Sequence, residues 1–471
     1  MLALRYVPLI VAVTVACGSS GSSTDEGGGG SAGAPGAAGS GMSSAGAASG
    51  AGAGDGAGEG GSSANAGSGS GGAGAAASGA AGGAAGSGGS FVAGGEGGTA
   101  SGPALDCGKN GVAIENAGPT ANRVNYVILG DGYDANGVST TFLQHIEVAM
   151  QKRFSSPIGE PYGRYRKFVN ICAIKTVSQN SGIGNGPTPF SCTGDDESRL
   201  ANCNTQAAEA ELDAQLPDTF EVDWHAIVLN NNRWWNTGSP WMLWSGAHAD
   251  ADGAALHEGG HGFHQLADEY SGTSSNCGEF NEVNSTANAS TTNGKWTLWL
   301  GYDDVGATGI QGTIQGSRYC SNTSGQYRPS DNSMMNSLFG DDPDTSFNPV
   351  SREKIIMDIW RIVKPVDSVE PAAGAVAAPT TLRVNVIDPA VISVDWSVDG
   401  NVVAKAGGTS FNVAAANLPS GEHTIEAKAY DNATDALVRY NTGTCADMQR
   451  CWRRDAWKSS QQTVSWTVTV P

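Results

Sequence analysis

The sequence predicts an α/β (α+β) domain followed by a small all-β sandwich, with a long disordered linker rich in Gly, Ala and Ser in front of both. Three observations predict this organisation. From residue 18 to about residue 100 the chain is almost wholly Gly, Ala and Ser, a composition that cannot build a core. Between residues 122 and 363 strand and helix patterns follow one another. After Pro365 only short strands separated by turns remain.

Residues 1–17 have the features of an export signal. Arg5 supplies positive charge, and the apolar run from Val7 to Ala16 is too short to span a bilayer. The run ends at Thr14-Val15-Ala16-Cys17, which resembles a bacterial lipobox, in which the cysteine becomes lipidated. We therefore expect an exported protein. It is either a lipoprotein of the bacterial outer membrane or cell surface, anchored through Cys17, or a protein secreted after ordinary signal cleavage.

Residues 18–104 form the predicted disordered linker. Their glycines follow no strict triplet period, which excludes collagen and favours a flexible tether. A chain of this kind reaches about 5–6 Å times the square root of its length, on the order of 50 Å here. Such a tether would carry a folded domain clear of a membrane surface.

The cysteines predict disulfides. The chain has nine cysteines, and eight remain when Cys17 is set aside. This even number, in a chain that is expected to leave the reducing cytosol, is typical of disulfide pairing. Two pairs are close enough in sequence for local bridges, and elimination then gives two longer ones; the pairs are Cys192 with Cys203, Cys445 with Cys451, Cys277 with Cys320 and Cys107 with Cys172. No spacing is that of a CxxC pair, so a structural zinc cluster is not expected.

The formal net charge of −20 excludes the usual signature of a nucleic-acid-binding protein, which is a basic surface. Few of the acidic residues lie in the linker, so the charge belongs mainly to the folded part. Solubility outside the cell explains this charge better than a cationic substrate does.

Residues 105–365 are the predicted α/β domain. Strands are expected at 122–129, 168–174 and 223–230, with a turn at 130–133, and helices at 141–154, from about Ala251, and at 351–363. Two tryptophan-rich segments, 233–235 and 241–244, precede the second helix. Core packing explains them better than aromatic subsites on an edge strand that pairs with a substrate.

Residues 366–471 resemble an immunoglobulin-like β-sandwich. Apolar and polar residues alternate at 382–387, 391–398, 411–413, 423–430 and 464–470, and Asp399-Gly400 and residues 419–421 are turn signals. Residues 445–458 are interpreted as a solvated loop inserted before the last strand. This segment is basic through Arg450, Arg453, Arg454 and Lys458.

The segment His257-Glu258-Gly259-Gly260-His261 fits the HExxH pattern. On a helix two histidines four residues apart stack one turn apart, so both imidazoles can reach one ion. Zinc prefers such nitrogen ligands, and at an open position it lowers the pKa of a bound water to about 7. Glu258 would lie beside that water as the general base. The two glycines cost about 1 kcal/mol each in helix propensity, which a purely structural helix has little reason to accept.

Three residues are candidates for the third ligand, and their spacing alone does not choose among them: His264, Asp268 and Glu269. On an unbroken helix Asp268 would lie about 16 Å from His257 along the axis, too far to share an ion. The helix must therefore end soon after His261 if Asp268 is to bind. His264 lies within one turn but is rotated further round, so it could instead support the ligands or face a substrate.

The stretch from His257 to Tyr270 (HEGGHGFHQLADEY) resembles the signature of the IgA peptidase family of zinc metallopeptidases, in which Leu-x-Asp-Glu-Tyr follows HExxH. Residues 128–133, 178–182, 327–330 and 333–335 agree with the family in the same order. The resemblance covers roughly residues 122–365 and implies a metzincin-like zinc peptidase fold for this domain. It implies His257 and His261 as zinc ligands, Glu258 as the base, and an acid of the Asp268-Glu269 pair as the third ligand. We take Asp268.

Two further residues are assigned roles near the metal. Ser333-x-Met335 resembles the Met-turn of metzincin-like peptidases, in which a methionine packs beneath the metal without binding it; Met334 is the alternative because the residue is doubled. Tyr327 is a candidate to stabilise the oxyanion of the tetrahedral intermediate.

Two acidic segments faintly resemble calcium loops, but neither has the full ligand spacing. The first contains Asp131, Asp134 and Asn136 before Gly137, and the second contains Asp341, Asp342 and Asp344. Calcium binding is therefore unsupported, and both segments are interpreted as solvated turns.

The sequence thus predicts an exported zinc-dependent endopeptidase that hydrolyses internal peptide bonds of extracellular proteins or peptides. The first alternative is a surface adhesion or glycan-binding protein with an inactive metallopeptidase-like scaffold. Intact His257, Glu258 and His261 argue against it. The second is an exopeptidase or amidase with the same metal chemistry. Nothing in the sequence specifies immunoglobulin as a substrate.

Overall fold

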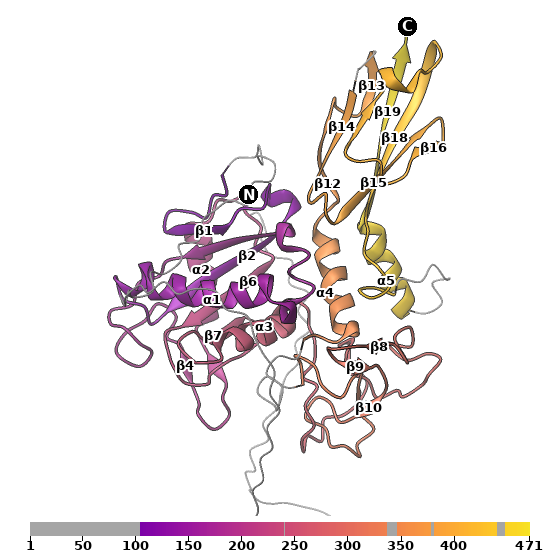
Figure 1. Cartoon of the computed structure of the whole chain (residues 1–471). Coiled ribbons are helices and arrows are strands. Elements are labelled where there is room, and N and C mark those ends of the chain that lie inside the picture. The colour runs from indigo at the N-terminus through magenta and orange to yellow at the C-terminus, as the bar shows by residue number, and fades with distance from the viewer. Residues whose placement is uncertain (1–103, 240, 337–345, 378–380, 440–447) are drawn as a thin grey trace, which may run out of the picture. The chain divides into compact units, whose positions relative to one another are not determined.

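The computed structural model describes residues 104–239, 241–336, 346–377, 381–439 and 448–471 (Figure 1). The predicted export signal with Cys17 and nearly all of the linker lie outside these ranges, as do Cys445 and the acidic residues 341–344. Within the ranges, no helix combines the length and the apolar character that a membrane span requires.

A five-stranded mixed sheet forms the centre of the first folded part. The strands lie in the order β1-β3-β2-β6-β7, and all neighbours are parallel except β1 and β3. The predicted strands are confirmed to within two residues at their ends, whereas β1 and β7 were not predicted. The bounds are β1 (Gly111–Glu115), β2 (Val124–Asp131), β3 (Val169–Ile174), β6 (Trp224–Leu229) and β7 (Met242–Ser245).

Helices cover both faces of this sheet, which explains why every residue of β2 is buried. Tyr126 and Ile128 pack into the same core as α1 (Thr141–Ser155) and α3 (Ala251–Gly262). Val127 and Leu129 point to the other face and pack with α2 (Thr205–Gln215), a helix that was not predicted. The metal motif therefore lies on a helix packed against the sheet (Figure 1).

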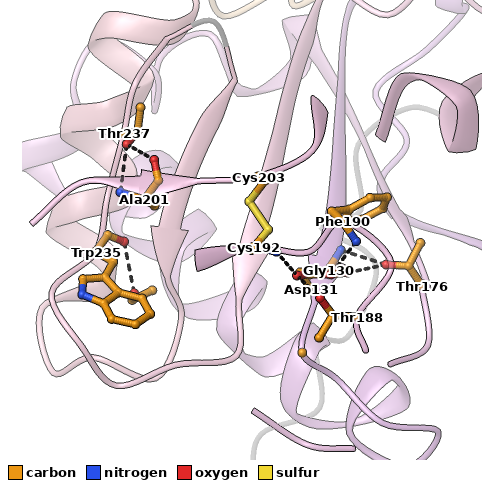
Figure 2. Close-up of a disulfide and its surroundings, with 12 residues drawn as sticks. Gly130, Asp131, Thr176, Thr188, Phe190, Cys192, Ala201, Cys203, Trp235 and Thr237 are labelled. Carbon is orange, nitrogen blue, oxygen red and sulfur yellow. Dashed lines mark hydrogen bonds between the residues drawn. A yellow bond between two sulfur atoms is a disulfide. The ribbon is translucent and has the colours of Figure 1, made fainter. Parts of the chain in front are cut away.

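Three of the predicted disulfides are confirmed: Cys107–Cys172, Cys192–Cys203 and Cys277–Cys320. In Figure 2 the Cys192–Cys203 bridge lies beside Asp131 at the end of β2. The Asp131 carboxylate accepts hydrogen bonds from the backbone of Phe190 and Cys192 and from the hydroxyl of Thr188. Burial raises the pKa of Asp131, and these hydrogen bonds oppose that rise.

The interpretation of Asp131 as part of a solvated turn is therefore wrong. Its side chain is fully buried and organises the loop at residues 188–192. The physical reason is that β2 runs through the centre of the sheet, so its last residue is still covered by neighbouring chain. Asp134 lies in an ordinary turn, where its carboxylate accepts from the backbone of Asn136 and Gly137.

The interpretation of residues 445–458 as a solvated loop is also wrong for the residues that the structure describes. Residues Met448–Ser459 form the helix α5, which packs on α4 (Pro349–Ile362). Arg453, Ala456 and Trp457 are buried, and their spacing places them on one face of the helix. The guanidinium of Arg453 donates to Glu353 of α4 at 2.6 Å. A basic residue that seemed solvated is therefore part of a buried ion pair.

Residues 366–471 contain two antiparallel β-sheets, with one added parallel strand, as an immunoglobulin-like domain requires. The indole of Trp396 packs at 5.9 Å from Trp466 in its own sheet and at 5.3 Å from Phe411 in the other, so it joins the two layers. All five predicted strands are found, and β12, β13 and β16 are additional. The smaller sheet has the order β12 (Val366–Glu370), β14 (Thr381–Val386), β17 (Ser410–Asn412). The larger sheet has the order β13 (Gly374–Ala377), β19 (Gln461–Val470), β18 (Gly421–Asp431), β15 (Ile392–Val398), β16 (Asn401–Ala404).

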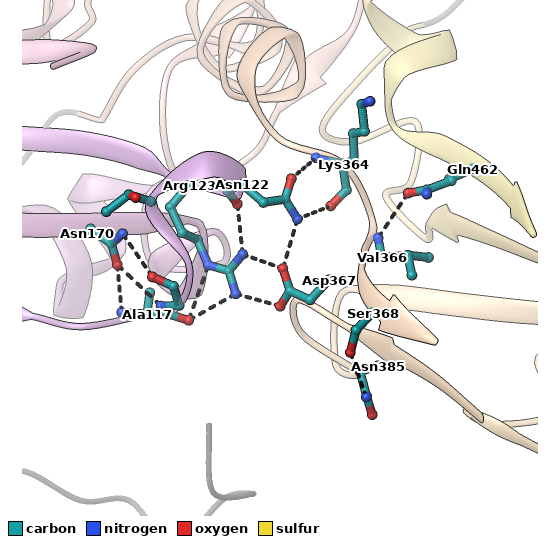
Figure 3. A network of polar contacts seen from close by, with 12 residues as sticks. Ala117, Asn122, Arg123, Asn170, Lys364, Val366, Asp367, Ser368, Asn385 and Gln462 are labelled. Carbon is teal, nitrogen blue, oxygen red and sulfur yellow. Dashed lines mark hydrogen bonds and ion pairs between the residues drawn. The ribbon is translucent and has the colours of Figure 1, made fainter. Parts of the chain in front are cut away.

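A polar network joins the start of β12 to the segment before β2 (Figure 3). The guanidinium of Arg123 is only 2% exposed and donates to both carboxylate oxygens of Asp367 at 2.7 Å. The side-chain amide of Asn122 donates to the backbone carbonyl of Lys364, and the side-chain oxygen of Asn122 accepts from the backbone amide of Lys364. Arg123 also donates to the carbonyl of Ala117. A buried cation is thus neutralised by a single carboxylate from the neighbouring sandwich.

We expect Asp367→Ala to lower the free energy of unfolding by about 2–3 kcal/mol, because it leaves the buried Arg123 without its counter-charge. The matched control is Glu115→Ala. Glu115 is exposed to a similar degree as Asp367 (27% against 21%), but its partner Arg166 is 37% exposed. The control should cost less than about 1 kcal/mol. Thermal denaturation of both variants checks this, and equal losses would contradict it.

Candidate metal centre

Helix α3 ends at Gly262, one residue after the second motif histidine, and the chain then turns back. The backbone amide of Gln265 donates to the carbonyl of His261, which is the single 5→1 hydrogen bond of an αL helix end, and the amide of Leu266 donates to the carbonyl of Gly260. Gln265 takes the left-handed conformation (φ 53°) that this helix end needs and that glycine usually supplies. The early helix end on which the choice of Asp268 depends is therefore present.

The side chains of His257, His261 and Asp268 meet at one point. The Nε2 atoms of the two histidines are 3.0 Å apart, and they lie 3.1 and 3.2 Å from one carboxylate oxygen of Asp268. In the described residues this is the group of His, Cys, Asp and Glu side chains that could hold a metal ion. An ion with three such ligands at about 2.0–2.1 Å would separate them by about 3.3 Å in a tetrahedron, so the donor set fits zinc.

The outer nitrogens of both histidines are held by backbone carbonyls. His257 Nδ1 donates to Met334 at 2.8 Å and His261 Nδ1 donates to Leu266 at 2.6 Å. A proton on Nδ1 leaves the Nε2 lone pair free for a metal. Burial works against ionisation of Asp268, but the two histidines outweigh it and hold the pKa of Asp268 well below its usual range. Burial lowers the pKa of His261, but Asp268 outweighs it and raises that pKa to about 9, so an ion bound by His257, His261 and Asp268 would have to displace a proton from His261.

Glu258 lies next to the first histidine and is only 8% exposed. Burial raises the pKa of its carboxyl, while His257 and His261 oppose the rise. A raised pKa suits a general base that must accept a proton near neutral pH.

The paired glycines of the motif have a packing role that the sequence did not reveal. A Cβ on Gly259 would lie 2.6 Å from the guanidinium of Arg153 and 2.9 Å from the ring of Trp224. A Cβ on Gly260 would lie 2.7 Å from the sulfur of Met335. Arg153 and Met335 are fully buried, so the two glycines let the core approach α3 closely.

Met335 thus lies against the metal helix, and its backbone is tied to the acidic segment that follows. Its carbonyl accepts from the amide of Glu269 at 2.7 Å, while the carbonyl of Met334 holds His257. Both methionine side chains are buried. The backbone carbonyls of Met334 and Met335 therefore hold His257 and Glu269, while both methionine side chains are buried away from solvent.

We expect Gly259→Ala to lower the free energy of unfolding by about 1–3 kcal/mol, because the new methyl group meets a buried ring and guanidinium. Helix propensity alone predicts the opposite, a gain of about 1 kcal/mol. Gly253→Ala is the control, because Gly253 is partly exposed in the first turn of the same helix and should follow propensity. Chemical denaturation checks both variants. A gain for Gly259→Ala would contradict the packing role.

The two other candidates for the third ligand point elsewhere. His264 is fully buried and bonds through Nδ1 to Asp358 of α4 at 3.0 Å, because the chain turns after Gly262. Burial lowers the pKa of His264 to about 4, although Asp358 opposes this. The suggestion that His264 faces a substrate is therefore wrong.

Glu269 is also fully buried, and it holds three separate segments together. Its carboxylate accepts from the side chains of Asn284, Ser333 and Asn348. Burial raises the pKa of Glu269 to about 7, and these hydrogen bonds oppose the rise. Asp268 and Glu269 thus face opposite ways: the first faces the histidines, and the second fixes the loop that carries it.

Two tyrosines line the site: Tyr270, which ends the signature segment but was assigned no role, and Tyr319, which sequence reasoning missed. The ring of Tyr270 stacks 5.9 Å from His257, and Tyr319 lies 5.8 Å from Tyr270. Nothing in the spacing marked Tyr319, which comes from a loop about fifty residues after Asp268. Tyr327 lies in β11 (Tyr327–Arg328), where its backbone pairs with Thr286. In the described part of the chain, neither a hydrogen bond nor a ring contact joins Tyr327 to the metal group.

Core packing was predicted for both tryptophan-rich segments and is confirmed for 241–244; in 233–235, Arg233 is exposed and Trp234 and Trp235 are only partly buried. Trp241 and Trp244 are buried. The outer edge of β7 is already used, since Leu243 exchanges two backbone hydrogen bonds with Thr237. Leu243 is therefore not free to pair with a substrate backbone.

Comparisons with known proteins find two families. Residues 112–307 match the model of the family described as IgA Peptidase M64, and residues 365–427 match that of a bacterial Ig domain. The fibronectin(III)-like modules of Clostridium thermocellum CbhA are 16% identical over 22% of this chain and 93% of that chain, with a TM-score of 0.13, which is too low to carry an argument. No curated protein matches the chain significantly.

Proposed function

We propose that this chain is an exported zinc-dependent endopeptidase that hydrolyses internal peptide bonds of extracellular proteins, because residues 112–307 match the model of the IgA peptidase M64 family. The observation that carries the proposal is the convergence of His257, His261 and Asp268 at one point, with Glu258 beside them. The family match supports a metallopeptidase, and the donor set fits zinc.

In this proposal each residue has a definite task. His257, His261 and Asp268 would hold the ion through two Nε2 atoms and one carboxylate oxygen, and the carbonyls of Met334 and Leu266 orient the two rings. A zinc ion held there would supply Lewis-acid polarisation of the scissile carbonyl and would acidify a water molecule. Glu258 accepts a proton from the attacking water and passes it to the leaving amine.

We expect Glu258→Ala to retain one zinc ion per chain and to lose cleavage by about 10²–10⁴-fold, since it removes only the general base. The assay uses the full mature chain, loaded with zinc, and a library of end-blocked peptides read by mass spectrometry. Asp268→Ala is the companion variant and should lose zinc. Zinc at full occupancy in Asp268→Ala would remove Asp268 as the third ligand.

The same assay separates the alternatives. Internal cuts in end-blocked peptides support an endopeptidase, whereas cuts only in peptides with free ends support an exopeptidase. Wild-type chain that binds zinc but cleaves nothing would favour the adhesion or glycan-binding scaffold.

We also propose export with lipid attachment at Cys17, on the basis of the N-terminal sequence. Labelled palmitate should enter the wild-type chain in a bacterial host and should not enter Cys17→Ser. Equal labelling of the two chains would rule out Cys17 as the anchor and would leave ordinary secretion.

A further inference from the structure

Two consecutive residues beside the metal group hold an unusual backbone conformation. Arg318 and Tyr319 have φ angles of 53° and 60°, the left-handed region that residues with a Cβ rarely adopt. A left-handed pair without glycine persists only where the surrounding structure fixes it, and such positions cluster at functional sites.

The surroundings fix this pair against the segment that carries Asp268. The amide of Arg318 donates to the carbonyl of Asp268, and the amide of Tyr319 donates to the carbonyl of Tyr270, both at 2.9 Å. The carbonyl of Tyr319 accepts from Ser274 at 2.7 Å. The next residue, Cys320, is bridged to Cys277. Residues 318–320 are thus attached by these three backbone hydrogen bonds and one disulfide to the segment 268–277, which begins with the candidate ligand.

The phenol of Tyr319 is on the open side of the site. The residue is 52% exposed, whereas Asp268 and His261 have 20% and 17% of their side chains exposed and His257 only 4%. Its hydroxyl interacts with the Asp268 carboxylate. A hydrogen bond joins the two groups, so the hydroxyl is a donor directed at the metal group. A neutral hydrogen-bond donor therefore lies at the edge of the metal group from which a substrate must approach.

We propose that Tyr319 is a catalytic residue of the peptidase reaction, whose hydroxyl donates a hydrogen bond to the oxyanion of the tetrahedral intermediate. This inference rests on the proposed function. It assigns to Tyr319 the role that sequence reasoning gave to Tyr327.

The step balances without a further reactant. The water oxygen forms a bond to the carbonyl carbon, the π electrons move to the carbonyl oxygen, and Glu258 takes the proton of the water. Tyr319 keeps its own proton and donates a hydrogen bond to the negative oxygen. When the C–N bond breaks, the electron pair returns to the carbonyl and the proton on Glu258 passes to the amine.

The test compares Tyr319→Phe with wild-type full-length chain loaded with zinc, and Tyr327→Phe is the matched control. Removing one oxyanion donor should lower kcat by about 10²–10³-fold. KM, zinc affinity and thermal stability should stay near wild-type values. Binding of a phosphinic peptide, a tetrahedral analogue, measured by calorimetry should weaken in parallel with kcat/KM. Tyr327→Phe should match wild type in all four measurements.

Three outcomes would overturn the inference. Unchanged kcat in Tyr319→Phe removes the catalytic role while the proposed function stands. Loss of zinc affinity together with activity makes Tyr319 a positioning residue for Asp268 and not a catalytic one. A wild-type chain that neither cleaves peptides nor binds the phosphinic peptide overturns both the inference and the proposed function.

Discussion

The reversal of the chain after α3 is the constraint on which the site depends. A helix that continued past Gly262 would carry Asp268 away from His257, and no group of three ligands could form. The structure stops the helix with Gln265 in the left-handed conformation and then fixes the returning segment from behind through Glu269. Because Glu269 bonds to three separate segments, the position of its neighbour Asp268 is set by residues far away in the chain.

Buried polar groups do much of this fixing. Between α3 and α4 the described residues contain only strands of two residues, so repeated backbone ladders cannot hold this region. The carboxylates of Glu269 and Asp131 each accept hydrogen bonds from backbone or side-chain donors in loops. The carboxylate of Glu353 in α4 accepts a hydrogen bond from Arg453 in α5. A buried carboxylate is costly unless its oxygens are satisfied, and here several donors satisfy each one. Part of the acidity of the chain is thus internal structure and not surface charge.

The same loop-rich region places Arg318 and Tyr319 beside Asp268. Backbone hydrogen bonds connect the two segments, and the Cys277–Cys320 bridge closes the loop between them. Helix α3 supplies two histidines and Glu258 from one rigid element, whereas the loops supply Asp268 and the tyrosines. A rigid helix with a set of fixed loops is a common way to hold groups that must be positioned closely.

The sequence by itself determined the features that depend on local periodicity and chemistry. Local sequence patterns predicted β2, β3, β6, α1 and α4, the HExxH motif predicted α3, alternation predicted the sandwich, and cysteine count and spacing predicted three disulfides. Spacing of four on a helix brought His257 and His261 together. Tertiary structure decided the rest. The choice between Asp268, Glu269 and His264 depends on a left-handed Gln265, which propensity does not predict. The reason for Gly259 and Gly260 lies in Arg153, Trp224 and Met335, which are distant in sequence. Tyr319 reaches the site only because long-range hydrogen bonds bring two loops together, and contacts of that kind leave no periodic pattern in a single sequence.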